Sequence, residues 1–193
     1  MGAGKSECSR ILSNEGYRVI DGDGEAKKVM MSDRTIRRKI AETFGAETVD
    51  ENGINFRILG AVVFSTPERL RALNTIVHPV LLRHLHRLVH QQDTSLIALD
   101  AALIPLWQIE EWFDLLLWVT TSFETRLRRL KVARPDLDES SIIRRMQQQE
   151  REFSAPPETI WRHIDNSGDL PSLGKRIRSL LAAPQHPEVA VVD

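Results

Sequence analysis

The stretch Met1-Gly2-Ala3-Gly4-Lys5-Ser6 opens the chain and decides its fold. Its Gly-Lys-Ser end matches the second half of a phosphate-binding loop, GxxxxGK[ST]. In such a loop backbone N–H groups surround the phosphates, the lysine reaches the outer ones and the hydroxyl binds Mg²⁺. Residues 7–14 follow as a predicted helix whose N-terminus favours an anion, and Gly16 is suited to its C-terminal cap. The opening residues therefore predict a phosphate site.

The first half of this motif would lie upstream of Met1, together with the buried strand that leads into such a loop. We therefore expect Met1 to be an internal methionine of a longer protein, preceded by roughly ten residues. A sheet without its central strand leaves buried backbone groups unpaired, at about 1–3 kcal/mol each. Either the chain is then marginal and aggregation-prone, or a tail strand such as residues 189–192 substitutes poorly. A flexible glycine-rich start before an ordinary helix is the alternative reading.

Composition narrows the class of protein. With 193 residues, 41% of them hydrophobic, the chain can form one α/β domain with an inserted helical subdomain. The balance of 26 basic and 27 acidic residues argues against a nucleic-acid partner. No apolar run approaches the ~20 residues of a membrane span, so no membrane partner is expected. A single cysteine, Cys8, excludes an internal disulfide and suits the cytoplasm. Oligomeric state stays open.

Short apolar stretches alternate with helical ones along the chain. The predicted strands are residues 17–21, 96–100, 115–120 and 163–165. The further predicted helices are residues 26–31 and 35–44, a long set of helical stretches over residues 56–91, and residues 122–134, 139–152 and 171–182. This alternation indicates an α/β fold, with a parallel sheet flanked by helices on both faces. Residues 184–193 are expected to form a loosely ordered tail.

Two carboxylates, Asp21 and Asp23, stand at the carboxyl end of the strand 17–21. Ligands of open α/β sheets bind at these strand ends. A carboxylate there can accept a hydroxyl proton or help to hold Mg²⁺ through water. The alternative is a helix N-cap and a turn, in which Asp and Gly are common.

Asp100 ends the buried strand 96–100, where it either holds the water shell of Mg²⁺ or caps the next helix. His78 precedes Pro79, which predicts the end of a helix, and a histidine there is more often structural than catalytic. Trp107, Trp112, Trp118 and Trp161 are interpreted as core or subunit packing residues.

The helix 122–134 predicts an inward face of Phe123, Leu127 and Leu130, at positions i, i+4 and i+7. Its remaining faces are basic: Arg126, Arg128, Arg129, Lys131 and Arg134. A second helix adds Arg144, Arg145 and Arg151. Basic helix faces are usually only solvated, but phosphoryl transfer needs cations over the developing charge, and two basic helices suit a hinged lid.

Taken in order, several pieces of the chain resemble the dephospho-CoA kinases. They are Gly4-Lys5-Ser6, Val19-Ile20-Asp21-Gly22-Asp23, Arg57, Phe64 and Pro67, Ile76-Val77-His78-Pro79, the segment from Glu124 to Arg129, Gln149, and Ile164-Asp165-Asn166-Ser167-Gly168. Together they span residues 1 to about 180. Their order is more specific than any single piece.

The resemblance implies a P-loop kinase fold over residues 1–183, with a helical acceptor-binding subdomain at about 45–92 and a lid at about 122–153. It implies transfer of the γ-phosphoryl group of ATP to the ribose 3′-hydroxyl of dephospho-CoA, the last step of coenzyme A synthesis. It implies these residue roles: Asp23, Lys5 and Arg129 in catalysis; Gly2, Ala3, Gly4, Lys5, Ser6 and Asn166 in ATP binding; Arg57 and His78 in acceptor binding; Ser6 and, through water, Asp100 on Mg²⁺.

The chain also departs from the family pattern. Ala102 and Leu106 stand where the family carries a proline and a glutamate after Asp100, and residues 150–153 replace its usual sequence after Gln149. These departures leave two other functions open: another small P-loop kinase of a metabolite or nucleotide, and an inactive P-loop module that only binds nucleotide or a partner.

Overall fold

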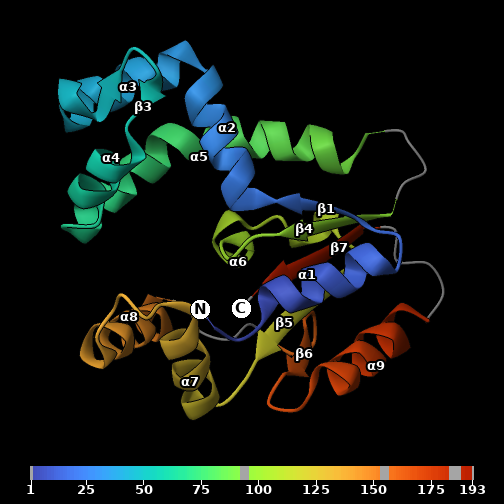
Figure 1. Cartoon of the computed structure of the whole chain (residues 1–193). Coiled ribbons are helices and arrows are strands. Elements are labelled where there is room, and N and C mark those ends of the chain that lie inside the picture. Colours follow the sequence, from blue (N-terminus) through green and yellow to red (C-terminus); the bar gives the residue numbers. More distant parts are fainter. Residues whose placement is uncertain (1, 92–95, 153–156, 183–187, 193) are drawn as a thin grey trace. The chain divides into compact units, whose positions relative to one another are not determined.

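A mostly parallel sheet of five strands forms the centre of one of the two units of the described chain, in the order β1-β4-β7-β5-β6 (Figure 1). The computed structural model describes residues 2–91, 96–152, 157–182 and 188–192. The strands are β1 (Arg18–Asp21), β4 (Ile97–Asp100), β5 (Leu115–Thr120), β6 (Arg162–Asp165) and β7 (Glu188–Val192). The pairs β4–β7, β7–β5 and β5–β6 are parallel, which confirms the predicted fold class.

This sheet unit comprises residues 1–20 and 93–193, and the second unit comprises residues 21–92. The helices of the sheet unit are α1 (Lys5–Asn14), α6 (Ile104–Trp107), α7 (Phe123–Ala133), α8 (Glu139–Glu152) and α9 (Leu170–Leu181), with a 3-10 turn at Glu110–Trp112. The second unit contains α2 (Gly22–Ser32), α3 (Arg34–Phe44), α4 (Phe56–Val63), α5 (Pro67–Val89), a 3-10 turn at Ala46–Thr48 and the short hairpin of β2 (Val49–Asp50) and β3 (Gly53–Ile54). No helix within the described ranges is long and apolar enough to cross a membrane.

The central strand of the sheet comes from the end of the chain. β7 lies between β4 and β5, with Ala190 in register with Leu99 on one side and Leu116 on the other. All residues from Val189 to Val192 are fully buried. The prediction of a loosely ordered tail is therefore wrong for residues 188–192. Pairing of β7 with β4 and β5 satisfies the backbone hydrogen-bonding groups of both neighbours. This gain outweighs the conformational entropy that a free tail would keep. Residues 184–187 and 193 lie outside the described part.

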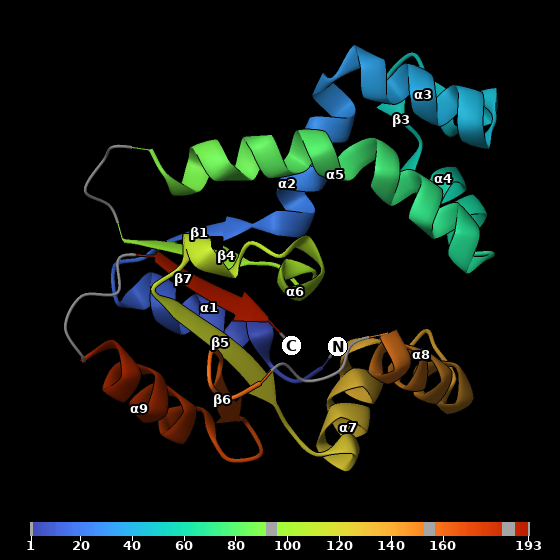
Figure 2. The same ribbon diagram turned by 180° about the vertical axis from the view of Figure 1, so that it is seen from behind.

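Helices α1 and α9 cover one face of the sheet (Figures 1 and 2). Their apolar stripes, with Leu12 on α1 and Ile177 on α9, pack on alternate residues of the strands, such as Leu117 and Val191. This alternation follows from the two-residue period of a strand and the 3.6-residue period of a helix. On β5 the next residue, Trp118, contacts Trp161 edge to face at 6.1 Å, so these two tryptophans are packing residues as predicted.

In the second unit the predicted set of helices over residues 56–91 consists of α4 and α5. The break falls where the Thr66 hydroxyl accepts a hydrogen bond from the Arg69 backbone N–H at 3.3 Å and Pro67 starts α5. The predicted helix end at His78-Pro79 is wrong, because α5 continues through Pro79. A proline inside a helix removes one backbone hydrogen bond. The buried stripe of Val77, Leu81, Leu85 and Val89 on α5 offsets that loss.

A charge placed within β7 tests whether β7 is the central strand of the sheet. Val191→Asp is expected to unfold the sheet unit or to lower its melting temperature sharply, because an unpaired buried carboxylate costs several kcal/mol against a total stability of about 5–15 kcal/mol. Val132→Asp is the matched control, since Val132 is 80% exposed on α7. That control should stay within about 0.5 kcal/mol of wild type in chemical unfolding. A Val191→Asp protein as stable as wild type would contradict the assignment of β7.

Candidate active site

The phosphate loop of the sheet unit is held tightly at Gly4. This glycine precedes α1 with a φ of 108°, in the left-handed region that suits a residue without a Cβ. A Cβ at position 4 would lie 2.0 Å from Nδ2 of Asn166. Ala3, next to it, is only 4% exposed. Gly4 is therefore required both by its backbone angle and by the closeness of Asn166.

Helix α1 begins at Lys5, two residues earlier than the sequence predicted. Its first backbone N–H groups have no acceptor within the helix, and its dipole adds positive potential at the same point, so the end of α1 is suited to phosphate. Ser6 is exposed in this first turn. Cys8 is buried and packs in the core, as expected.

Lys5 forms an ion pair with Asp100, which ends β4. The two side chains are 18% and 13% exposed, so the pair is largely shielded from water. The other carboxylate oxygen of Asp100, Oδ2, accepts a hydrogen bond from the Ser9 hydroxyl at 2.5 Å. Asp100 therefore does not cap the next helix, which has Leu103 at its N-cap. The fold brings a cation and an anion 95 residues apart in sequence to one point at the sheet edge.

Three segments meet at the backbone carbonyl of Ala3. It accepts hydrogen bonds from Nδ2 of Asn166 at 2.7 Å and from Nη1 of Arg129 at 3.3 Å. Arg129 also donates from Nη2 to the Asn166 carbonyl at 2.9 Å. The structure thus joins three predicted site residues: Ala3 of the loop, Arg129 of α7 and Asn166 after β6. The remaining amide oxygen of Asn166, Oδ1, is buried without a hydrogen-bond partner.

The predicted lid corresponds to α7 and α8. Leu130, Ile142 and Met146 form a small separate core between the two helices, with Leu127 against it. Phe123 does not belong to this core, because it is 38% exposed at the first residue of α7, and its predicted inward position is wrong. The side chains of Arg145, Gln149 and Arg151 lie outside the described part of the chain.

Two of the basic side chains of α7 are engaged in ion pairs with α8. Arg126 contacts Glu150 at 2.8 Å, and Lys131 contacts Glu139 at 2.7 Å. These partly exposed ion pairs add a little to the apolar core between the two helices. Arg129, also on α7, reaches the phosphate loop through its hydrogen bond to the Ala3 carbonyl.

The other predicted site residues belong to the second unit. Asp21 is the N-cap of α2, and its carboxylate accepts a hydrogen bond from the Asp23 backbone N–H at 3.1 Å. Asp23 is exposed in the first turn. Arg57 is exposed on α4, and His78 is half-buried on α5, where burial lowers its pKa. Asp21 thus takes the N-cap role that the sequence left as an alternative, while Asp23 is open to solvent.

A family model described as dephospho-CoA kinase matches residues 1–170. The chain belongs to this family. A dephospho-CoA kinase of Fusobacterium nucleatum is 29% identical over 180 residues, covering 91% of this chain and 90% of the relative. One of Thermus thermophilus is 30% identical over 185 residues, with 94% and 87% covered. The predicted family membership is confirmed, and with it the expectation of an ATP-dependent kinase.

Solved structures support the fold. The crystal structure of TT1252 from Thermus thermophilus is 27% identical, with a TM-score of 0.72, and the match covers 96% of this chain and 94% of that one. A dephospho-CoA kinase from Campylobacter jejuni has a TM-score of 0.61 at 18% identity, over 94% and 91% of the two chains, and supports the fold.

Two polar contacts of this family member were missed from the sequence. Ser9 stands four residues after Lys5, and that spacing places both on one helix face, a signal that was readable. The second is the contact of His84 Nε2 with Glu25 Oε2 at 2.7 Å in the second unit. Burial raises the pKa of Glu25, but hydrogen bonds from Lys28 and His84 outweigh it and leave the pKa lowered. No sequence signal links residues 59 positions apart.

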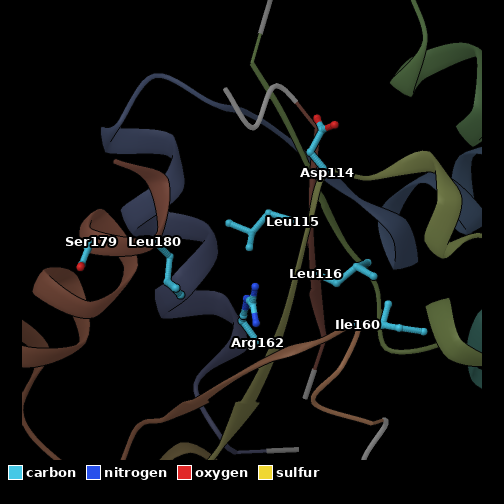
Figure 3. Close-up of a pocket in the computed structure, with 7 residues that line it drawn as sticks. All are labelled: Asp114, Leu115, Leu116, Ile160, Arg162, Ser179 and Leu180. Carbon is cyan, nitrogen blue, oxygen red and sulfur yellow. The ribbon is translucent and has the colours of Figure 1, made fainter. Parts of the chain in front are cut away.

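A cavity of about 440 Å³ lies at the opposite end of the strands. Figure 3 shows it at the start of β5 and β6, where its lining includes Leu115, Leu116, Ile160, Arg162 and Leu180. Its lining combines aliphatic side chains with the charged Asp114 and Arg162 and the polar Ser179. The cavity therefore lies apart from the phosphate loop and lacks the helix N-terminus that phosphates prefer.

Gly4→Ala tests the geometry of the loop. The new methyl group would collide with Asn166, and the left-handed backbone alone costs a non-glycine residue roughly 1–2 kcal/mol. ATP affinity is expected to fall by at least about ten-fold in titration calorimetry. Gly60→Ala in α4 is the control, since its Cβ would meet nothing closer than 3.9 Å, and ATP binding should be unchanged. Wild-type ATP affinity in Gly4→Ala would overturn this description of the loop.

Proposed function

We propose that this chain transfers the γ-phosphoryl group of ATP to the ribose 3′-hydroxyl of dephospho-CoA, the last step of coenzyme A synthesis. The observation that carries the proposal is the phosphate loop at the start of α1, with Lys5 beside Asp100, in a chain whose first 170 residues match the dephospho-CoA kinases. The cytoplasmic location of the protein and the absence of a nucleic-acid or membrane partner stay predictions.

The phosphate end of ATP would lie at the start of α1. The backbone N–H groups there and the Lys5 ammonium group would hold the β- and γ-phosphates. Lys5 would exchange Asp100 for phosphate oxygens, because both are anionic partners within reach of one flexible side chain. Arg129, already hydrogen-bonded to the Ala3 carbonyl, would place its guanidinium group near the transferring phosphoryl group.

Mg²⁺ fits the oxygen donors next to this loop. Ser6 offers an exposed hydroxyl, and Asp100 a carboxylate that would act through water. Among the described residues there is no cluster of three or more His, Cys, Asp or Glu side chains that could hold a metal ion. Mg²⁺ commonly keeps several waters and binds through one or two protein oxygens together with substrate phosphates, so it does not need such a cluster. When bound, it would neutralise charge on the phosphates.

Asn166 would contribute to ATP binding beside the same loop. Its Nδ2 is engaged with Ala3, while Oδ1 is buried without a partner. A buried acceptor that stays unpaired costs about 1–3 kcal/mol. A donor on the bound nucleotide, such as an exocyclic amino group, would satisfy it.

The acceptor would be bound by the second unit. Asp23 is exposed in the first turn of α2, with its backbone fixed by Asp21, and would orient the 3′-hydroxyl or accept its proton. Arg57 would contribute a positive charge for the phosphates of dephospho-CoA. Because burial lowers the pKa of His78, this imidazole would be neutral at pH 7 and would contribute a hydrogen bond rather than a charge.

Lys5→Ala tests the phosphate site. Phosphoryl transfer to dephospho-CoA is expected to fall to background, because the loop loses its cation, while the fold is retained in circular dichroism. Lys175→Ala is the matched control, an exposed lysine on α9 of the same unit. The wild-type protein should be assayed against dephospho-CoA, nucleosides and other alcohols. Faster phosphorylation of one of the other acceptors than of dephospho-CoA would contradict the proposed function.

Asp23→Asn separates catalysis from ATP binding. The amide keeps the shape of the side chain but does not accept the proton, so kcat is expected to fall by ~10²–10⁴-fold with little change in KM for ATP. Asp21→Asn is the comparison, and it should mainly lower stability by weakening the N-cap of α2. If Asp21→Asn abolishes turnover while Asp23→Asn retains it, the roles of the two carboxylates are reversed.

A further inference from the structure

We infer that Ser9 is a positioning residue of the phosphate site, holding Asp100 in place for the Mg²⁺-bound nucleotide; this inference rests on the proposed function of that site. Ser9 is only 8% exposed on α1, and its hydroxyl donates to Oδ2 of Asp100 at 2.5 Å. It also lies 3.2 Å from the Lys5 carbonyl, one helical turn earlier.

The two oxygens of Asp100 have different partners. Oδ1 faces the Lys5 ammonium group, and Oδ2 faces the Ser9 hydroxyl. When Lys5 turns to the phosphates, Oδ1 loses its partner, and the carboxylate is then free to rotate unless another group fixes it. The Ser9 hydrogen bond fixes it, because Ser9 is carried by the rigid first turns of α1 rather than by the loop.

The consequence is specific to the metal-bound state. A carboxylate acts on the waters of Mg²⁺ only from a defined direction, since the ion requires near-octahedral geometry. Removing the hydrogen-bond partner of such a carboxylate typically lowers metal affinity 10–100-fold. In the described part of the chain the Ser9 hydroxyl is hydrogen-bonded to Asp100 and lies near the Lys5 carbonyl, so its effect on the phosphates would pass through Asp100.

A plain packing role for Ser9 makes a different prediction. A buried hydroxyl that only fills space would affect ATP binding equally with and without Mg²⁺, and its removal would act independently of Asp100. The hydrogen bond instead predicts that the effects of Ser9 and Asp100 are coupled, as contacting residues are in double-mutant cycles.

ATP binding to the whole chain should be measured by titration calorimetry, with Mg²⁺ and with EDTA. For Ser9→Ala we expect about ten-fold weaker binding with Mg²⁺ and wild-type binding in EDTA. Ser9→Thr, which keeps the hydroxyl, should restore most of the Mg²⁺-dependent affinity. Ser13→Ala is the control on the same helix, since Ser13 is exposed. In the Asp100→Asn background, the further change Ser9→Ala should have less than about a two-fold effect.

Equal losses with Mg²⁺ and in EDTA, or additive losses in the double variant, would overturn the inference. The binding measurements need no acceptor, so the inference and the proposed function can fail separately. If dephospho-CoA is not phosphorylated but the Mg²⁺-dependent loss is found, the proposed acceptor is wrong and the role of Ser9 stands. If transfer occurs and Ser9→Ala binds Mg²⁺ and ATP as wild type does, the role of Ser9 is wrong.

Discussion

The pairing of β7 with β4 and β5 is the constraint on which the sheet unit depends. A parallel sheet buried on both faces cannot leave backbone N–H and C=O groups without partners, and β7 satisfies those of two neighbours at once. Its carboxyl end lies beside Asp100, through the hydrogen bond from the Ala101 N–H to the Val191 carbonyl at 3.2 Å. The strand that fixes the core therefore also fixes the edge of the sheet where Lys5 and Asp100 meet.

Two groups of short polar contacts surround the phosphate loop at this edge of the sheet. Lys5, Ser9 and Asp100 form one group, and Ala3, Arg129 and Asn166 form another on the other side of Gly4. Each group draws on segments far apart in the sequence. Arg129 donates to the Ala3 carbonyl and Leu130 lies against Gly2, so α7 and the phosphate loop are in direct contact within one unit. A shift of α7 is therefore expected to change the position of the phosphate loop.

Much of the fold was readable because its signals are local. The run LLLWVT at residues 115–120 is apolar throughout, as a strand buried on both faces requires, and it forms β5 over those six residues. The serine at position 122 predicts a helix start, and it caps α7 by accepting from the Thr125 backbone N–H. Where a local sequence rule gave the wrong prediction, tertiary packing decided the structure instead. Pro79 stays inside α5 because the residues around it bury an apolar stripe.

The sequence alone determined the α/β class, the phosphate loop and the family to which the chain belongs, since these rest on residue types at short, fixed spacings such as Gly4-Lys5-Ser6. It named Lys5, Asp100, Arg129 and Asn166 one by one, but only the tertiary structure decided that they meet. It predicted residues 184–193 as a loosely ordered tail and offered residues 189–192 only as a poor substitute for a missing strand, because five residues carry no information about which strands they will pair with. Pairing partners and side-chain contacts are long-range properties, and the packed structure decides them because burial and backbone hydrogen bonding are satisfied only in the whole fold.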